Sequence, residues 1–233
     1  MSISLTTGIT PEHDCPYLST QRARELVVFS AKDSNLPYQQ LIEQGFRRSG
    51  NEVYRPHCIE CQQCQSLKVD VQNFTPTRSQ KRVLKRNQDL SFRWADQLSL
   101  KQFDLYKRYL NCRHNDGEMT HHNFNDYRDF IHSHWQTTRF LETYLQDELV
   151  AVAITDWLEL GLSAVYSFFA PELEKRSVGR WLILTQIQQA RENQKQWLYL
   201  GYQIDSCQKM NYKQHFHPHQ RFIYGQWLGE YNE

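Results

Sequence analysis

The pattern of apolar residues between residues 140 and 202 constrains the fold of this chain more than any other feature. Three runs with strand-like composition, FLETYL, LVAVAIT and LSAVYSFF, follow one another with short connections between them. Residues 178–193 then have helical spacing, and a fourth strand-like run, QWLYLGY, comes directly after them. Three meandering strands followed by a helix and a fourth strand predict an α+β arrangement of packed layers.

The same order of elements forms the core of the GNAT acyltransferase fold, a likeness of architecture that says nothing by itself about activity. Upstream, the sequence predicts strands at residues 24–30, near Val53 and at residues 67–71, and helices over residues 37–46, 75–89, 98–112 and 123–135. We therefore expect an N-terminal α+β lobe over residues 1–95, which contains clustered cysteines and a basic helix. Residues 96–233 are expected to form a GNAT-like catalytic lobe.

Charge and hydropathy narrow the class of protein. Lys and Arg number 27 against 26 Asp and Glu, so the chain is not of the strongly basic kind that coats nucleic acid nonspecifically. The longest apolar run, residues 149–154, is far shorter than the roughly 20 residues that cross a bilayer. The first residues have neither the basic nor the apolar region of a secretory signal. We therefore expect a cytoplasmic protein with no membrane partner.

Positive charge is concentrated in one block. Residues 54–95 carry 8 basic and 3 acidic side chains, whereas residues 96–160 carry 6 and 11. Within the basic block, RSQKRVLKR places five cations and no acid on about two helical turns, with Val83 and Leu84 facing inward. The outward face has the charge to follow a phosphate backbone, and its candidate contacts are Lys81, Arg82, Lys85 and Arg86. The alternative interpretation is an ordinary solvated helix face.

Three cysteines have the spacing of metal ligands. Cys58, Cys61 and Cys64 form a C-x2-C-x2-C run, and Cys15 is a candidate fourth ligand. Zinc and an iron–sulfur cluster both fit this set, because a reducing compartment disfavours structural disulfides. The alternative is that these thiols only pack against their neighbours.

Two further features are candidates for an acid–base residue and an anion-binding site. Asp156 ends the central apolar strand and is the best-placed carboxylate for acid–base work, with a surface acid as the alternative. Residues 176–180 lie between a strand and a helix, where backbone N–H groups at Ser177 and Gly179 can bind an anion or simply begin the helix. This loop partly matches the pyrophosphate loop of acyl-coenzyme A enzymes, but Trp181 occupies a position where those enzymes have a small residue.

Seven segments in register carry a resemblance over essentially the whole chain. They are GFRRSG, YRPHC, SQKRVLKRN, LVAVAITD, LSAVYSFFAP, SVG and WLYLGYQIDSCQKMNYK. Together they closely resemble the arginyltransferase family, and within it the bacterial branch that transfers leucine. The resemblance implies transfer of leucine from leucyl-tRNA to the α-amine of proteins that begin with Asp or Glu, which directs them to N-end-rule degradation. Eukaryotic relatives are thought to bind a metal or an iron–sulfur cluster through N-terminal cysteines; this chain has Leu18 where they have the second cysteine of a C-G-Y-C motif.

The residues present agree with the aminoacyl transfer that this resemblance implies. An aminoacyl ester is already activated, so the enzyme must align an amine with a carbonyl and stabilise an oxyanion, and it requires no cofactor. Our hypothesis is that Asp156 orients or deprotonates the amine, while Tyr166 or Tyr202 moves a proton or donates to the oxyanion. An acidic acceptor side chain needs a cation, and the cations matched by the resemblance are Arg47, Arg48, Lys209 and Lys213.

Three alternatives remain at this point. One is an arginyl-tRNA–protein transferase of the same family. Another is a noncatalytic, metal-braced RNA-binding module. The third is a conventional acyl-coenzyme A acetyltransferase.

Overall fold

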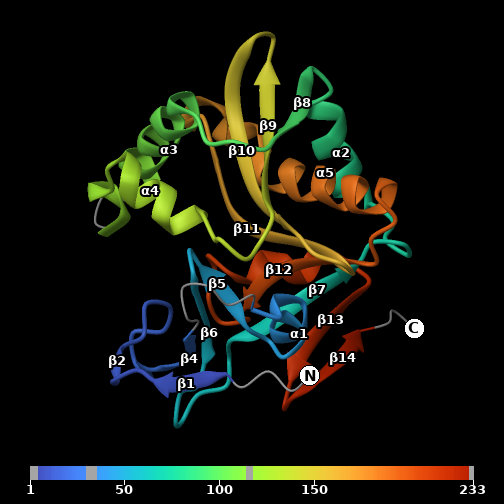
Figure 1. The fold of residues 1–233 in the computed structure, drawn as a ribbon. Helices are drawn as coiled ribbons and strands as arrows, with labels where there is room; N and C mark the ends of the chain where they lie inside the picture. Colours follow the sequence, from blue (N-terminus) through green and yellow to red (C-terminus); the bar gives the residue numbers. More distant parts are fainter. Residues whose placement is uncertain (1–4, 30–35, 114–117, 231–233) are drawn as a thin grey trace.

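A large mixed sheet dominates the computed structural model, which describes residues 5–29, 36–113 and 118–230 (Figure 1). Its eight strands lie in the order β14-β13-β7-β12-β11-β10-β9-β8. Their bounds are β7 (Gln65–Asp70), β8 (Leu90–Ala95), β9 (Thr138–Leu145), β10 (Glu148–Trp157), β11 (Gly161–Phe169), β12 (Trp197–Gln203), β13 (His219–Ile223) and β14 (Gln226–Glu230). Strands β9, β10 and β11 form an antiparallel meander, and β12 lies parallel to β11. The predicted GNAT-like order of strands is therefore confirmed.

Helices on this sheet create the main core. The helices are α2 (Arg78–Arg86), α3 (Leu100–Arg113), α4 (Phe124–Ile131) and α5 (Val178–Glu192), with short 3-10 helices at Glu118–His121, Pro171–Arg176 and Asn211–His215. Helix α5 connects β11 to β12 and packs on both, while α3 packs on β10 and β11. The central strands are fully buried, as the run from Val150 to Ile154 shows, because helices cover the sheet. Helix α4 ends earlier than predicted, since the backbone of His132 is already extended.

A smaller sheet lies beside the large one. It has the order β1-β4-β6-β5, with bounds β1 (Thr6–Ile9), β4 (Glu25–Phe29), β5 (Arg47–Ser49) and β6 (Glu52–Pro56). A two-stranded ribbon, β2 (His13–Asp14) with β3 (Arg22–Ala23), and the short helix α1 (Tyr38–Glu43) complete this part. A second core cluster joins the two sheets, because Val28 and Leu41 pack in it together with Leu158, directly after β10, and Trp197 of β12.

The division predicted at residue 95 does not coincide with a break in the architecture. Strands β7 and β8 come from the first 95 residues and yet pair within the large sheet, with β12 and β9 respectively. The strands that were not predicted from the sequence are β1, β2, β3, β5, β8, β13 and β14. Among the described residues, no helix combines the length and the apolar character that crossing a membrane requires.

Candidate active site

A row of polar side chains, three of them buried, crosses the large sheet at one register level. Thr138 of β9 lies opposite Asp156 of β10, Asp156 lies opposite Ser163 of β11, and Ser163 lies opposite Tyr199 of β12. Directly paired residues point to the same face of a sheet, so these four side chains share the face on which the smaller sheet packs. One short segment, residues 43–48, supplies the polar partners of this row.

Arg48 and Asp156 form a buried ion pair between the two sheets. Arg48 Nε donates to Asp156 Oδ2 at 2.7 Å, and a second guanidinium nitrogen donates to Oδ1. Thr138 Oγ1 also donates to Asp156 Oδ1, at 2.8 Å, and Arg48 donates to the carbonyl of Ile131 at 2.8 Å. Both side chains of the pair are 0% exposed. This bidentate, fully enclosed pair fixes β5 to β10.

That geometry corrects two predictions. Both carboxylate oxygens of Asp156 are occupied and sealed from solvent, so this residue does not face an incoming amine as a base. Arg48 is already paired with Asp156 and is not placed to bind an acceptor carboxylate. We assign both residues a positioning role instead.

Arg47 lies where β11 and β12 stop pairing. The parallel register ends at Ser163 and Tyr199, and a bulge follows between Tyr199 and Gly201. Arg47 donates to Ser163 Oγ at 3.1 Å and to the Ala164 carbonyl at 2.7 Å. Its guanidinium also lies against Gly201, where an added Cβ would be 3.1 Å from Arg47 Cζ. Arg47 therefore occupies the vertex between the two strands.

Arg47 has no carboxylate at ion-pair distance among the described residues, although it is only 8% exposed. A buried guanidinium is costly to leave without an anion. The structure thus holds a buried positive charge at the strand vertex, and its hydrogen-bond acceptors within the described part of the chain are two neutral oxygens.

Lys213 is buried against β12, close to the same vertex. Its Nζ donates to the backbone carbonyl of Tyr202 and lies 3.9 Å from Met210 Sδ. The pKa of Lys213 is lowered to about 7, first because burial removes water from the ammonium and second because the charge of Arg47 repels it. Lys209, four residues earlier, is exposed, so the structure separates these two predicted acceptor residues.

The two predicted tyrosines lie in different surroundings. The hydroxyl of Tyr202 donates to carbonyl oxygens of Gly45 and Tyr54, at 3.2 and 3.3 Å, and burial raises its pKa well above the usual value. The Tyr202 hydroxyl thus points into the smaller sheet, away from the vertex. Tyr166 is half-buried on β11, beyond the last residue of β11 that pairs with β12, and its ring packs against Phe130. Burial also raises the pKa of Tyr166, so its phenol stays protonated and able to donate.

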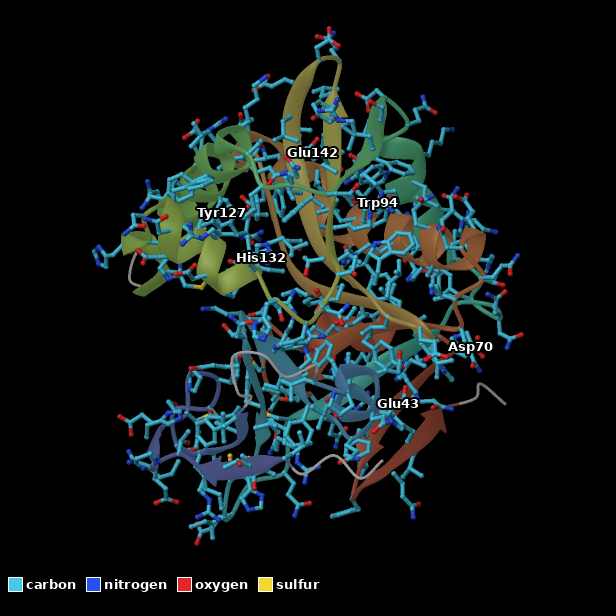
Figure 2. All side chains as sticks on the ribbon, in the orientation of Figure 1. Glu43, Asp70, Trp94, Tyr127, His132 and Glu142 are labelled. Atoms are coloured by element: carbon cyan, nitrogen blue, oxygen red, sulfur yellow. The ribbon has the colours of Figure 1, made fainter. Side chains whose placement is uncertain are left out.

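Glu43, at the end of α1, contacts two strands of the large sheet (Figure 2). It accepts from Lys68 Nζ at 2.7 Å and from the hydroxyl of Tyr199. The ammonium of Lys68 also lies 4.2 Å from the ring centroid of Trp227 in β14. This cluster fixes α1 on β7 and β12, immediately before the segment that carries the two arginines.

The predicted tRNA face is exposed as expected. Helix α2 begins with a capping box between Thr77 and Gln80, and Val83 faces inward. The cationic side chains that point to solvent are Arg78, Lys81, Arg82, Lys85 and Arg86.

The turn before α5 lies beside that face. Arg86 donates to the Lys175 carbonyl at 2.9 Å, which ties α2 to this turn. Ser177 adopts a left-handed conformation there, with φ 59°, and its side chain makes no cap hydrogen bond. Gly179 is half-buried in the first turn of α5. Trp181 is buried against Phe92 in the core, so its bulk does not fill this loop.

The four candidate metal ligands line one cavity of about 730 Å³ in the smaller sheet's half of the molecule. They are Cys15, Cys58, Cys61 and Cys64. Burial and the neighbouring thiols raise the pKa of Cys64 to about 12, so it is held as a thiol. Within the described ranges, no three Cys, His, Asp or Glu side chains are arranged to hold one ion. A metal site at these four cysteines therefore stays a prediction.

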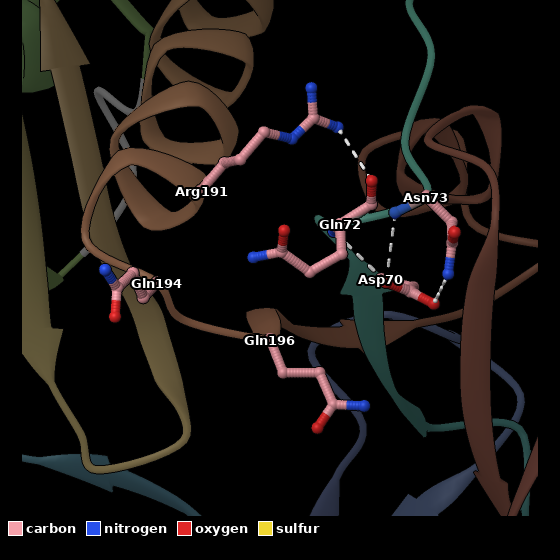
Figure 3. Close-up of a pocket in the computed structure, with 6 residues that line it drawn as sticks. All are labelled: Asp70, Gln72, Asn73, Arg191, Gln194 and Gln196. Atoms are coloured by element: carbon pink, nitrogen blue, oxygen red, sulfur yellow. Dashed lines mark hydrogen bonds between the residues drawn. The ribbon is translucent and has the colours of Figure 1, made fainter.

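A second hollow, of about 430 Å³, is lined by polar side chains at the end of α5 (Figure 3). Arg191 donates there to the carbonyls of Val71 and Phe74, and Asp70 accepts from the backbone of Gln72 and Asn73. These contacts tie α5 to the loop after β7. The hollow contains none of the predicted site residues.

Comparisons with known proteins identify the family. Residues 13–82 match the model "Arginine-tRNA-protein transferase, N terminus", and residues 101–223 match "Arginine-tRNA-protein transferase, C terminus". The chain belongs to this family. Two relatives named aspartate/glutamate leucyltransferase are similar over nearly their whole length. One, from Pseudoalteromonas atlantica, is 46% identical over 94% of this chain and 95% of its own. The other, from Teredinibacter turnerae, is 48% identical over 94% and 91%.

Among solved structures, L-PGS from Bacillus licheniformis is similar with a TM-score of 0.48 and 14% identity, over 60% of this chain and 45% of that one.

The chain is a member of an aminoacyl-tRNA–protein transferase family, so the strand vertex is a candidate active site for aminoacyl transfer. Sequence reasoning found Arg47 and Lys213 but missed Ser163 and Gly201, which place Arg47. Gly201 has φ +77°, a conformation that favours glycine, and it follows the strand-like run WLYL directly. A glycine inside an apolar strand is a signal for a bulge or a close approach, and it was available in the sequence.

Proposed function

We propose that this chain transfers leucine from leucyl-tRNA to the N-terminal α-amine of proteins that begin with Asp or Glu. The names of its full-length relatives support the donor amino acid and the acceptor class. The observation that carries the proposal is Arg47, a buried cation with no carboxylate partner among the described residues, at the vertex of β11 and β12.

Arg47 has the geometry to bind the side-chain carboxylate of an acidic acceptor. Two of its guanidinium nitrogens are held by Ser163 and Ala164, so its plane is fixed before substrate arrives. A carboxylate at the remaining donors would satisfy the buried charge, and charge-assisted bonds of this kind are the strong ones. An uncharged acceptor would leave the guanidinium without an anion, which is the physical basis for rejecting it.

The donor is proposed to approach along the basic face of α2. This face and the turn before α5 are joined by the Arg86 contact, so exposed cations extend toward the end of β11. A phosphate backbone on these cations would bring the aminoacyl end of the tRNA toward the vertex. The reaction itself is aminolysis of an activated ester, for which alignment and oxyanion stabilisation suffice. We propose Tyr166, a protonated phenol on β11, as a donor to the oxyanion.

The test is a transfer assay with purified protein. Radiolabelled leucyl-tRNA or arginyl-tRNA is mixed with peptides that begin with Asp, Glu, Cys or Ala, and label on peptide is measured. Leucine on the Asp and Glu peptides alone is the expected result. Transfer of arginine would overturn the donor assignment, and tRNA binding without any transfer would favour a noncatalytic RNA-binding module.

A further inference from the structure

The acceptor amine must lose a proton before it can attack, and Asp156, the predicted base, is not free to take it. An α-amino group has a pKa of roughly 7.7 to 8.0, so at neutral pH most acceptor arrives as ammonium. Asp156 is sealed in its pair with Arg48. A group near the vertex that accepts this proton would raise the share of acceptor that is able to attack.

Lys213 has the placement that a base there needs. It is 6% exposed and approaches β12 from the 3-10 helix Asn211–His215. Its Nζ contacts the Tyr202 carbonyl, which belongs to the part of β12 that no longer pairs with β11. Gly201, the preceding residue, lies against Arg47, so amine and guanidinium flank the same stretch of strand.

The surroundings of Lys213 favour an uncharged amine. Arg47 of β5 faces it with a positive charge, and within the described part of the chain no carboxylate forms an ion pair with it. Cys207, after β12, and Cys64, before β7, also act on it electrostatically, but neither thiol is hydrogen-bonded to Nζ. An ammonium buried beside a guanidinium without an anion tends to release its proton.

We propose that Lys213 is the general base of the transfer reaction: its uncharged Nζ accepts a proton from the acceptor's α-ammonium. This inference rests on the proposed function and replaces the acceptor-binding role first expected of Lys213. The freed lone pair forms the C–N bond to the leucyl carbonyl carbon, and the C–O bond to the tRNA ribose breaks. The second proton lost by the nitrogen goes to the departing ribose oxygen, and the new Lys213 ammonium releases its proton to solvent.

The test compares wild type, Lys213→Met and Lys213→Arg between pH 6 and 9, at saturating Asp-peptide and leucyl-tRNA. Loss of a general base lowers kcat by about 10²- to 10⁴-fold. We expect such a loss for both variants at pH 7. The deficit of Lys213→Met should shrink above about pH 8.5, where the acceptor amine arrives uncharged. Lys101→Met, at an exposed position on α3, should behave as wild type and serves as the matched control.

Several results would overturn the inference. Arginine keeps a cation but does not accept a proton, so full activity of Lys213→Arg would show that Lys213 serves as a charge. A deficit of Lys213→Met that is the same at every pH would show a structural role. If the variants fail to fold, the position of the break in the wild-type profile still decides. The proposal places the break in kcat at about pH 7, the pKa of Lys213, with a fall of about tenfold per pH unit below it. A flat profile, or a break at about pH 8 set by the acceptor amine alone, contradicts the proposal. Absence of transfer by wild type would instead refute the proposed function.

Discussion

Replacement of Asp156 by asparagine is expected to destabilise the protein severely. The substitution keeps the shape of the side chain but removes the charge that Arg48 contacts through two nitrogens. Both side chains are 0% exposed, so water does not replace the lost partner. Breaking a buried ion pair by removing one member costs about 3–5 kcal/mol because the other charge is left uncompensated. We expect the free energy of unfolding to fall by that amount.

Urea unfolding at pH 7, followed by tryptophan fluorescence, measures this change by linear extrapolation. The control is Asp129→Asn, which removes an exposed pair with Arg128, and it should cost less than about 1 kcal/mol. A double variant, Arg48→Met with Asp156→Leu, should recover most of the loss, since apolar replacement of a whole buried pair is often neutral. A loss for Asp156→Asn no larger than that of the control would refute the reasoning.

Three further predictions concern the surface, the vertex and pH. Charge reversal of the exposed α2 lysines, Lys81→Glu and Lys85→Glu, should weaken leucyl-tRNA binding and reduce its salt dependence. Fluorescence anisotropy at two salt concentrations measures both. If the variants match wild type in affinity and in the change of affinity with salt, this face of α2 does not bind tRNA. Gly201→Ala should raise KM for Asp-peptides at least several-fold, because the added Cβ would lie 3.1 Å from the guanidinium carbon of Arg47. The control is Gly225→Ala, where φ is +80° and no atom lies within 4 Å of the added Cβ. That substitution introduces backbone strain alone and should leave KM unchanged. Lys213 has a pKa of about 7 in the folded protein and about 10.4 in the unfolded chain. Burial of its ammonium therefore lowers the free energy of unfolding by the full amount below about pH 7, and this cost disappears as the pH rises toward about 10. The free energy of unfolding of wild type relative to Lys213→Met should therefore increase by up to about 1.4 kcal/mol per pH unit over that range, and a flat difference would contradict the buried-amine interpretation.

The sequence predicted the elements whose signal is local. The strands around residues 140–202, the helix before the last of them and the basic helix α2 were all visible in the spacing of apolar and charged residues. Strand β8 was missed because its mixed sequence has no clear alternation, and it is defined by pairing with β9. Strands β13 and β14 likewise depend on partners that are distant in the chain.

The site was predictable in composition but not in arrangement. Arg47 and Arg48 are adjacent and chemically identical, and nothing local distinguishes them. The difference arises from strands more than a hundred residues away: Arg48 meets Asp156, and Arg47 meets Ser163 and Ala164. Burial of Lys213 and exposure of Lys209 likewise depend on how the loop after β12 folds back on that strand.

The most direct test of the account is the acceptor preference of Arg47→Met. Leucyl transfer to matched peptides that begin with Asp or Asn is measured as kcat/KM, because Asn has the shape of Asp without its charge. A charge-assisted contact contributes about 1.5–3 kcal/mol. We expect wild type to prefer Asp strongly and the Asp-to-Asn ratio to fall at least about tenfold in the variant. An unchanged ratio in a folded, tRNA-binding Arg47→Met protein would contradict the assignment of the acceptor site to the vertex of β11 and β12.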